Sequence, residues 1–581
     1  MDTTRIESEN QTGEWLPSIG RFLGRTSIAY FTMEIALEPR IHTYSGGLGI
    51  LAGDTARSCA DLELPVVFVS LISRLGYLRQ DVAANGRQIE YPNPWNPAEF
   101  AKPLRAKIAV PIAKREVWIR PWLYVLRAPL GRMVPVLLLD TDLDENSPED
   151  RSITDVLYGG DEEYRLKQEI ILGIGGHRIL QALGFSIRKY HLNEGHAALL
   201  PLEILRRCPR PADQLHPGEL KYDISRPRAA CIFTTHTPVE AGHDRFSYDV
   251  VAHLLGDYID VEQLKLLAGP DKMNMTLLAL KLSGYVNGVA QRHAETTHRM
   301  FPGYRVRAIT NGVHLPTWAH ERFAALYDKN FPSWRHEPEV IVRADQISNA
   351  AISSAHQSAK SDLIALLKEK TGQEFPVDVP LIGFARRMTA YKRPDLLFQN
   401  LDRLAEISKQ FPFRVVMAGK AHPKDEPGKR LIQEIHERVT RLEGRLSVLF
   451  LPGYDMALAK TLVSGVDVWL NTPISPMEAS GTSGMKAALN GVLNLSVLDG
   501  WWVEACIEGV TGWAIGEDGR EGARLSTDSD LYDKLQSAVL PTYYNDRERW
   551  IWMMKQSISK IASYFNTHRM MRRYATEAYL G

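Results

Sequence analysis

The sequence LIGFARRMTAYKR, residues 381–393, joins a short apolar run to four cations within eight residues. Its apolar part, Leu381–Ala385, has the length and composition of a buried strand, and residues 394–410 have helical spacing. The alternation continues: we expect strands over Phe413–Ala418, Leu446–Leu451 and Val466–Leu470, and helices over 427–442 and 455–463. This pattern predicts a parallel, doubly wound sheet with an active crevice beyond the carboxyl ends of its strands.

Chemically active side chains follow these strand ends. They are Arg386 and Arg387 after the first strand, Lys420 after the second, Tyr454 after the third and Glu478 after the fourth. A loop between a strand and a helix exposes N–H groups that bind anions, and arginine and lysine add fixed positive charge. A run of cations is more often a solvated basic face. The position at strand ends favours a phosphate site here.

The first half of the chain also alternates strands with helices. Two stretches have the spacing of long helices, Arg165–Leu183 and Lys281–Phe301, and a third helix is expected over Ile347–Lys370, before a proline-containing linker. Strands are predicted over Ser27–Thr32, Val66–Leu71, Val117–Leu126, Val134–Asp140 and Ala229–Thr234. The chain is therefore predicted to be an α/β protein with two Rossmann-like domains that face each other across a cleft.

The composition is that of a soluble globular protein, and it excludes some classes of partner. Of the 581 residues, 69 are lysine or arginine and 69 are aspartate or glutamate, so the formal charge is zero. This balance argues against a nucleic-acid partner or a polybasic membrane surface. The four cysteines are scattered, as expected of reduced thiols, and no His-x-x-x-His pattern indicates a metal site. No signal or transmembrane segment is visible, so a cytoplasmic location is expected.

Residues 478–490, EASGTSGMKAALN, join a glycine-rich turn to the start of a helix. Such a turn presents N–H groups at the positive end of a helix dipole and can seat a phosphate. Lys486 follows among apolar neighbours, which is the usual setting of a lysine that forms a Schiff base. On chemistry alone, a structural turn with a surface lysine would be the better interpretation.

This block resembles the pyridoxal-phosphate lysine segment of the α-glucan phosphorylases, the family of glycogen, starch and maltodextrin phosphorylases. The resemblance implies covalent pyridoxal 5'-phosphate at Lys486, close to Thr482 and Ser483. Residues 386–393 are similar to the family's Lys-Arg-x-x-x-Tyr-Lys-Arg motif, which implies that Arg387 and Lys392 bind the substrate phosphate. Arg386 replaces the usual lysine beside the cofactor phosphate.

Further motifs match in order from Gly46 to Glu504, and the nearest likeness is to the short bacterial enzymes. The resemblance implies that His236 contacts glucose in the catalytic set with Lys486, Arg387 and Lys392. It also implies cofactor contacts from Tyr454 and Trp318, and substrate contacts from Gly47, Leu48, Asn311, Glu478, Ser480 and Gly481. It leaves Glu240 without a role, because this chain has one residue fewer before it than the family motif.

The resemblance implies phosphorolysis of the non-reducing ends of an α-1,4-glucan or maltodextrin by orthophosphate, giving α-glucose 1-phosphate with retention. The cofactor 5'-phosphate would exchange a proton with the substrate phosphate. The family also suggests a homodimer of GT-B architecture. The expected domains are residues 1–345, an N-terminal domain with the glycine loop, and residues 346–565, a cofactor-binding domain. A C-terminal helix, 566–581, is expected to cross back to the first domain.

Two other functions stay open. A glycosyltransferase that uses a nucleotide sugar would share the glycine loop and the basic strand ends, but it has no need of Lys486. A catalytically weak glucan-binding homologue is indicated by two departures from the family. Asp455 stands where larger relatives have an arginine near the cofactor phosphate, and Thr389-Ala390 replaces a His-Glu pair at the mouth of the site.

Overall fold

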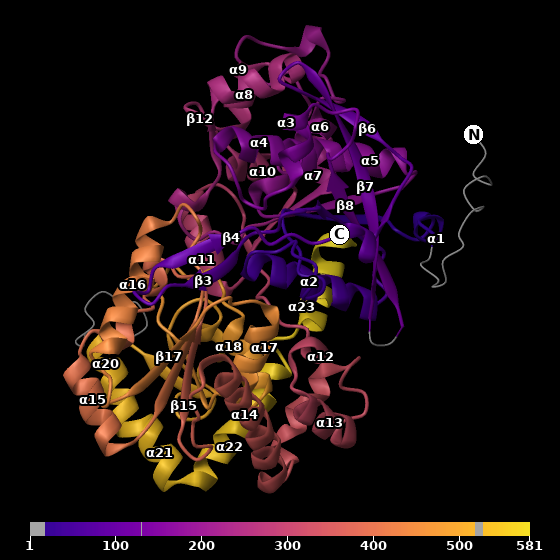
Figure 1. The fold of residues 1–581 in the computed structure, drawn as a ribbon. Coiled ribbons are helices and arrows are strands. Elements are labelled where there is room, and N and C mark those ends of the chain that lie inside the picture. Colours follow the sequence, from indigo (N-terminus) through magenta and orange to yellow (C-terminus); the bar gives the residue numbers. More distant parts are fainter. Residues whose placement is uncertain (1–17, 129–130, 517–526, 581) are drawn as a thin grey trace.

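The computed structural model describes residues 18–128, 131–516 and 527–580 and contains two large sheets flanked by helices (Figure 1). The second sheet has six strands, all parallel. Their order across the sheet is β17 (Ser447–Leu451), β16 (Arg414–Ala418), β15 (Leu381–Ala385), β18 (Val468–Asn471), β19 (Leu493–Val497) and β20 (Gly512–Ile515). In chain order this is 3-2-1-4-5-6, the Rossmann order, whose reversal point lies between β15 and β18. The predicted α/β class and doubly wound sheet are confirmed.

The first sheet is larger, and its central strands are parallel. The order is β14 (Arg307–Ala308), β13 (Tyr285–Gly288), β10 (Cys231–Thr234), β9 (Lys189–Asn193), β1 (Ile28–Thr32), β2 (Val66–Leu71), β8 (Met133–Asp140), β7 (Arg115–Arg127) and β5 (Lys102–Pro103), with β6 (Ile108–Ile112) paired to β7. From β14 to β8 every pair is parallel, and β7 and β5 run antiparallel. Strand order reverses between β1 and β9, so this sheet also has a crevice position at its carboxyl edge.

One predicted helix is wrong. Instead of a helix over Lys281–Phe301, the chain forms α10 (Met275–Leu282), strand β13 and α11 (Gln291–Met300). Gly284 follows the end of α10 where the backbone passes Arg228, and a Cβ there would lie 2.2 Å from the Arg228 carbonyl oxygen. The apolar run around Val286 then fills a central sheet position, because tertiary pairing overrides a local pattern that fits both helix and strand. The helix predicted over Arg165–Leu183 is present: α4 (Glu162–Ile170) continues through a π-helical turn into α5 (Gly176–Ala182).

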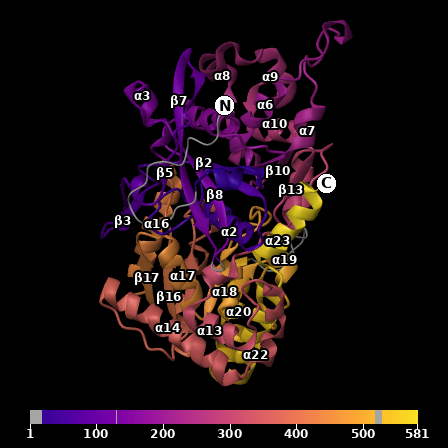
Figure 2. The same ribbon diagram turned by 90° about the vertical axis from the view of Figure 1, so that its right-hand side faces the viewer.

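The C-terminal segment packs against the first sheet although it follows the second one in sequence. Helix α23 (Thr567–Tyr574), drawn in yellow, lies beside α2 (Gly47–Asp61) in both views (Figures 1 and 2). The Tyr574 hydroxyl accepts a hydrogen bond from Asn287 Nδ2 at 2.9 Å, and the Tyr579 hydroxyl is 2.7 Å from His191 Nδ1. Met570, Met571 and Tyr579 are part of one apolar cluster with residues of β1 and β2.

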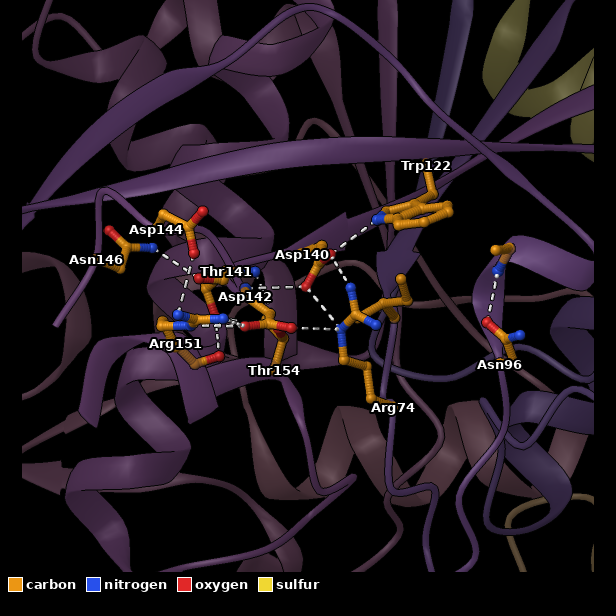
Figure 3. A network of polar contacts seen from close by, with 12 residues as sticks. Arg74, Asn96, Trp122, Asp140, Thr141, Asp142, Asp144, Asn146, Arg151 and Thr154 are labelled. Atoms are coloured by element: carbon orange, nitrogen blue, oxygen red, sulfur yellow. Dashed lines mark hydrogen bonds and ion pairs between the residues drawn. The ribbon is translucent and has the colours of Figure 1, made fainter. Parts of the chain in front are cut away.

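A polar network closes the carboxyl end of β8 (Figure 3). Asp140 is buried and accepts hydrogen bonds from Arg74 Nε at 3.2 Å and from Trp122 Nε1 at 2.8 Å. A buried carboxylate without such donors would be costly. The network therefore ties the loop after β2 to the antiparallel edge of the first sheet.

A hairpin from the first half joins the carboxyl ends of the second sheet. In strands β3 (Arg79–Val82) and β4 (Gln88–Tyr91), Gln80 Nε2 donates to the Gly419 carbonyl at 2.8 Å, and its Oε1 accepts from the Gly453 N–H at 3.0 Å. Gln88 bonds in the same two-sided way to the backbone of Ala421. These four bonds hold the loops after β16 and β17 against the first half. No helix in the described part of the chain is long and apolar enough to span a membrane.

Helix α14 (Asn349–Thr371) is attached to the second sheet by a buried ion pair. Lys360 Nζ lies 2.6 Å from Asp467 Oδ2, and His356 Nε2 lies 3.1 Å from Oδ1. Burial favours a raised pKa for Asp467, but Lys360 and His356 outweigh it and lower this pKa to about 2.

We predict that Lys360→Met costs about 3–5 kcal/mol of stability, because it leaves the buried Asp467 carboxylate without its cation. Urea unfolding followed by circular dichroism measures this. Lys368→Met on the same helix is the control, because among the described residues the Lys368 side chain forms only an exposed ion pair with Glu374 at 2.9 Å, and its loss should cost under about 1 kcal/mol. Equal effects of the two substitutions would contradict the prediction.

Candidate functional site

Lys486 is buried on α18 (Ser483–Leu489), the helix that follows β18. Its Nζ lies 3.8 Å from the centroid of the Trp318 ring, which closes the short helix α12 (Leu315–Trp318). Burial disfavours the ammonium form and lowers the pKa of Lys486 from 10.5 to about 8, against an opposing effect of Asp54. A useful fraction of this amine is therefore neutral and nucleophilic near neutral pH.

Glycines fix the position of α18. A Cβ on Gly484 would lie 2.3 Å from Asn494 Oδ1 and 2.7 Å from the Trp501 ring, so only glycine lets this turn pack on β19. Gly481 has a φ of +78°, which glycine adopts without strain. No side chain caps the N-terminus of α18. Ser483 Oγ instead accepts a hydrogen bond from Trp469 Nε1 at 3.0 Å. The uncapped N–H groups stay open to an acceptor.

A carboxylate lies between two of the predicted phosphate-binding cations. Glu478 Oε2 is 2.6 Å from both Arg386 Nη2 and Lys392 Nζ. Burial alone would raise the pKa of Glu478, but the two cations outweigh it and lower this pKa to about 2. Nε and Nη1 of Arg386 are buried and have no hydrogen-bond partner among the described residues. Arg386 therefore has spare donors for a further anion.

Arg387 is exposed, unlike its two neighbours in the cation cluster. In the described part of the chain its guanidinium has no hydrogen bond or ion pair, whereas the Arg393 side chain is bound to the carbonyls of Thr472 and Pro473. Thr389, where the family has histidine, has a buried hydroxyl without a described partner, and Ala390 is exposed. In this loop Arg393 is therefore structural, and Arg387 is open to solvent. The other two cations, Arg386 and Lys392, are paired with Glu478.

The glycine loop is held by Glu34, which sequence reasoning missed. Glu34 Oε2 accepts hydrogen bonds from the N–H groups of Ser45 at 2.6 Å and Gly46 at 3.1 Å, and Oε1 accepts from the Tyr158 hydroxyl at 3.0 Å. Helix α2 then begins at Gly47, which is exposed and would have open space beside an added Cβ. The signal that could have identified Glu34 is an acidic residue two positions after the buried strand β1.

His236 follows β10 and is fixed at two points. Its N–H donates to Glu194 Oε2 at 2.7 Å, and its ring Nε2 donates to Asn193 Oδ1 at 2.6 Å. Glu194 has a φ of +73°, an unusual backbone conformation for a side chain other than glycine or asparagine. Burial lowers the pKa of His236 to about 3. The ring is therefore neutral at ordinary pH and acts as a hydrogen-bonding group.

Asn311 and Trp318 lie on one segment that links the two halves. Thr310 Oγ1 donates to Glu504 Oε2 at 2.8 Å, and Arg569 of α23 donates to the Asn311 carbonyl at 3.1 Å. Asn311 Oδ1 is buried without a hydrogen-bond partner among the described residues. An unsatisfied buried acceptor is costly, so it marks a place where a donor from a ligand would be stabilising.

The side chain of Asp455 caps the N-terminus of a helix. Its Oδ1 caps α17 (Met456–Gly465) by accepting from the Leu458 N–H at 2.8 Å, and the Met456 N–H donates to the Tyr44 hydroxyl at 2.9 Å. The Tyr454 hydroxyl is 3.4 Å from the Ala385 carbonyl. Asp455 therefore neutralises the positive end of this helix in place of a ligand.

The predicted site residues thus form separate groups, each with direct contacts. Lys486 meets Trp318, Glu478 meets Arg386 and Lys392, and Tyr44 joins the glycine loop to α17. Ser480 is buried, and its carbonyl accepts from the Trp501 N–H at 3.0 Å. Asp499 was missed by sequence reasoning. It accepts the Glu478 N–H at 2.8 Å, and burial raises its pKa to about 6.

Comparisons with known proteins give the family. The model of the carbohydrate phosphorylase family matches residues 234–512. The chain is 40% identical to a maltodextrin phosphorylase of Thermococcus litoralis, over 95% of this chain and 70% of that protein. It is 33% identical to a glycogen phosphorylase of Aquifex aeolicus, over 95% of this chain and 86% of that one. An uncharacterized protein of Methanocaldococcus jannaschii is 31% identical over 95% of this chain and 99% of its own length. The chain belongs to the carbohydrate phosphorylase family.

We predict that His236 stays neutral across the physiological range, because burial penalises its charged form and lowers its pKa to about 3. Hydrogen–deuterium exchange at the ring C2–H, followed by mass spectrometry of the peptide against pH, gives the midpoint. The same peptide in the unfolded chain is the reference, with an ordinary value near 6.5. A folded-state midpoint equal to the unfolded one would contradict the prediction.

Proposed function

We propose that this protein is an α-1,4-glucan phosphorylase that transfers the terminal glucosyl group of a glucan to orthophosphate, with retention. The observation that carries the proposal is the buried Lys486, whose pKa is lowered to about 8, on a helix that follows the same strand as Glu478. A glycosyltransferase that uses a nucleotide sugar has no need of such an amine. The names of the maltodextrin and glycogen phosphorylases among the relatives support the same reaction.

The site fits pyridoxal 5'-phosphate. Lys486 offers an amine for the aldehyde, and Trp318 offers a flat apolar face. The uncapped N-terminus of α18, with Thr482 and Ser483, and the two unpaired donors of Arg386 offer a seat for the phosphate. When bound, the cofactor would supply a phosphate that acts as an acid and base. Tyr454 completes the proposed contacts from the end of β17.

Arg387 and Lys392 would bind the substrate phosphate. With Glu478 ionised, the cluster of Arg386, Arg387 and Lys392 retains an excess of positive charge, which attracts a phosphate dianion. Among the described residues, Arg387 has no hydrogen bond or ion pair that must break before it binds phosphate. Lys392 is bound to Glu478, so an incoming phosphate would share this ammonium with the carboxylate, and Glu478 would then be freer to accept a sugar hydroxyl.

The sugar would lie between the two sheets, in the cleft of a GT-B arrangement. The positions where strand order reverses, between β1 and β9 and between β15 and β18, support this placement, as do the bonds from Gln80 and Tyr44 to the second half. We assign the sugar contacts to Gly47, Leu48, neutral His236, Asn311, Glu478, Ser480 and Gly481. The proposed domains are residues 1–345 and 346–565, followed by the C-terminal helix 566–581. The proposed assembly is a homodimer.

Reduction of the purified protein with borohydride should fix one cofactor per chain at Lys486, because its amine is the buried nucleophile of the site. Mass spectrometry of the digest locates the adduct. The control is Lys486→Arg, which keeps the charge but cannot form the bond, and it should contain no adduct. An adduct at another lysine, or none in the wild type, would refute the proposal.

Arg387→Ala should weaken phosphate use far more than oligosaccharide binding. Loss of a charge-assisted bond to phosphate costs about 1.5–3 kcal/mol, or about 10–100-fold. The measurement is the KM for phosphate beside the dissociation constant of a maltodextrin. Arg430→Ala, an exposed arginine of α16 (Glu426–Thr440), is the matched control and should change neither. A weaker maltodextrin affinity with unchanged phosphate use would place Arg387 outside the phosphate site.

A further inference from the structure

Asp54 is a buried carboxylate in the middle of α2, the helix that begins at the glycine loop. Its Oδ2 accepts hydrogen bonds from Trp318 Nε1 at 2.8 Å and from the His314 N–H at 3.2 Å. Its Oδ1 is buried and has no hydrogen-bond partner in the described part of the chain. The nearest cation on its own helix is Arg57, whose Nη1 is 3.7 Å from Oδ1.

Trp318 connects this carboxylate to Lys486. The indole N–H points to Asp54, and the ring lies 3.8 Å from Lys486 Nζ at its centroid. A cation is attracted to the electron-rich face of an indole, and a carboxylate that accepts the indole N–H polarises the ring in the same sense. The carboxylate, the indole and the ammonium therefore form a chain of favourable contacts within a buried region.

We propose that Asp54 is the positioning residue and counter-charge of Lys486: it orients Trp318 against the amine and stabilises positive charge there. The role at the cofactor rests on the proposed function, whereas the effect on the free amine does not. In the free protein, Asp54 opposes the effect of burial on the pKa of Lys486. With the cofactor bound, the same negative charge would favour the protonated form of the lysine–cofactor link.

The other charged groups near this region have partners of their own. Asp61, two turns further along α2, is 2.8 Å from His314 Nε2 and 3.3 Å from His568 Nε2, and these rings hold its pKa at about 2 despite burial. Asp467, before β18, is bound to Lys360 and His356. On α17, which packs against α18, burial lowers the pKa of Lys460, and the charge that acts on it is Glu321. Arg57 is therefore the cation that competes directly for Asp54.

The test compares Asp54→Asn and Arg57→Gln with the wild type. Asparagine keeps an acceptor for the Trp318 N–H but removes the charge, so the apparent pKa of Lys486 should fall by about one unit, and the amine should react about tenfold faster at a pH below both values. Arg57→Gln frees Asp54 of its cation and should move this pKa upward. Competitive acetylation of the cofactor-free full chain by acetic anhydride, followed by mass spectrometry of the Lys486 peptide from pH 6 to 10, gives each midpoint.

The control is Glu38→Gln, which removes a carboxylate that binds the Tyr124 hydroxyl at 2.7 Å, and its midpoint should equal that of the wild type. With pyridoxal phosphate bound, the pH at which the cofactor absorbance changes should move downward in Asp54→Asn. Equal Lys486 midpoints in the wild type and Asp54→Asn, with thermal melting showing both folded, would overturn the proposal. A wild type that takes up no cofactor at Lys486 would refute the proposed function, and the acetylation result would still decide the role of Asp54.

Discussion

The burial of helix α2 is the constraint on which the arrangement of this protein depends. Twelve of its 15 residues are buried, including Asp54 and Asp61, and a buried carboxylate is tolerated only with donors around it. Asp54 and Asp61 both take donors from the 310–318 segment, and the His568 ring of α23 lies 3.3 Å from Asp61. Satisfying two carboxylates on one helix therefore brings together the glycine loop, the wall of the lysine site and the C-terminal helix.

Four of the six strands of the second sheet, β15 to β18, could be predicted because each is a short apolar run that alternates with helical spacing, whereas β19 and β20 were not predicted. The first sheet was harder. Strand β13 lies in a stretch whose residue spacing fits a helix. It forms a strand because it pairs with β10 and β14 in the sheet. Lys486 and His236 were expected at the site because their motifs resemble those of the family, not because of their local chemistry. Asp54 and Asp499 could not be expected in this way, because each acts through partners that are distant in sequence or through burial that no local pattern reveals.

Glu478 shows how electrostatics refines a role inferred from a motif. The resemblance to the family implies a sugar contact for it, and in the structure it lies between Arg386 and Lys392. In a buried site two adjacent cations repel each other, and one carboxylate that bridges them removes this cost. The residue proposed to contact the sugar is thus also the one that bridges the cations proposed to bind phosphate, so the binding of both substrates would depend on a single side chain.

The return of α23 to the first sheet has a consequence for the order of folding. Met570, Met571, Tyr574 and Tyr579 complete an apolar cluster whose other members lie mostly within residues 28–138. During synthesis these residues leave the ribosome only after the whole second half has been made. Until then the first half exposes the apolar surface that α23 later covers, together with the amide and imidazole partners of its tyrosines. The first sheet of a nascent chain therefore cannot be fully covered before the C-terminal segment has been made, and the apolar surface exposed until then favours aggregation.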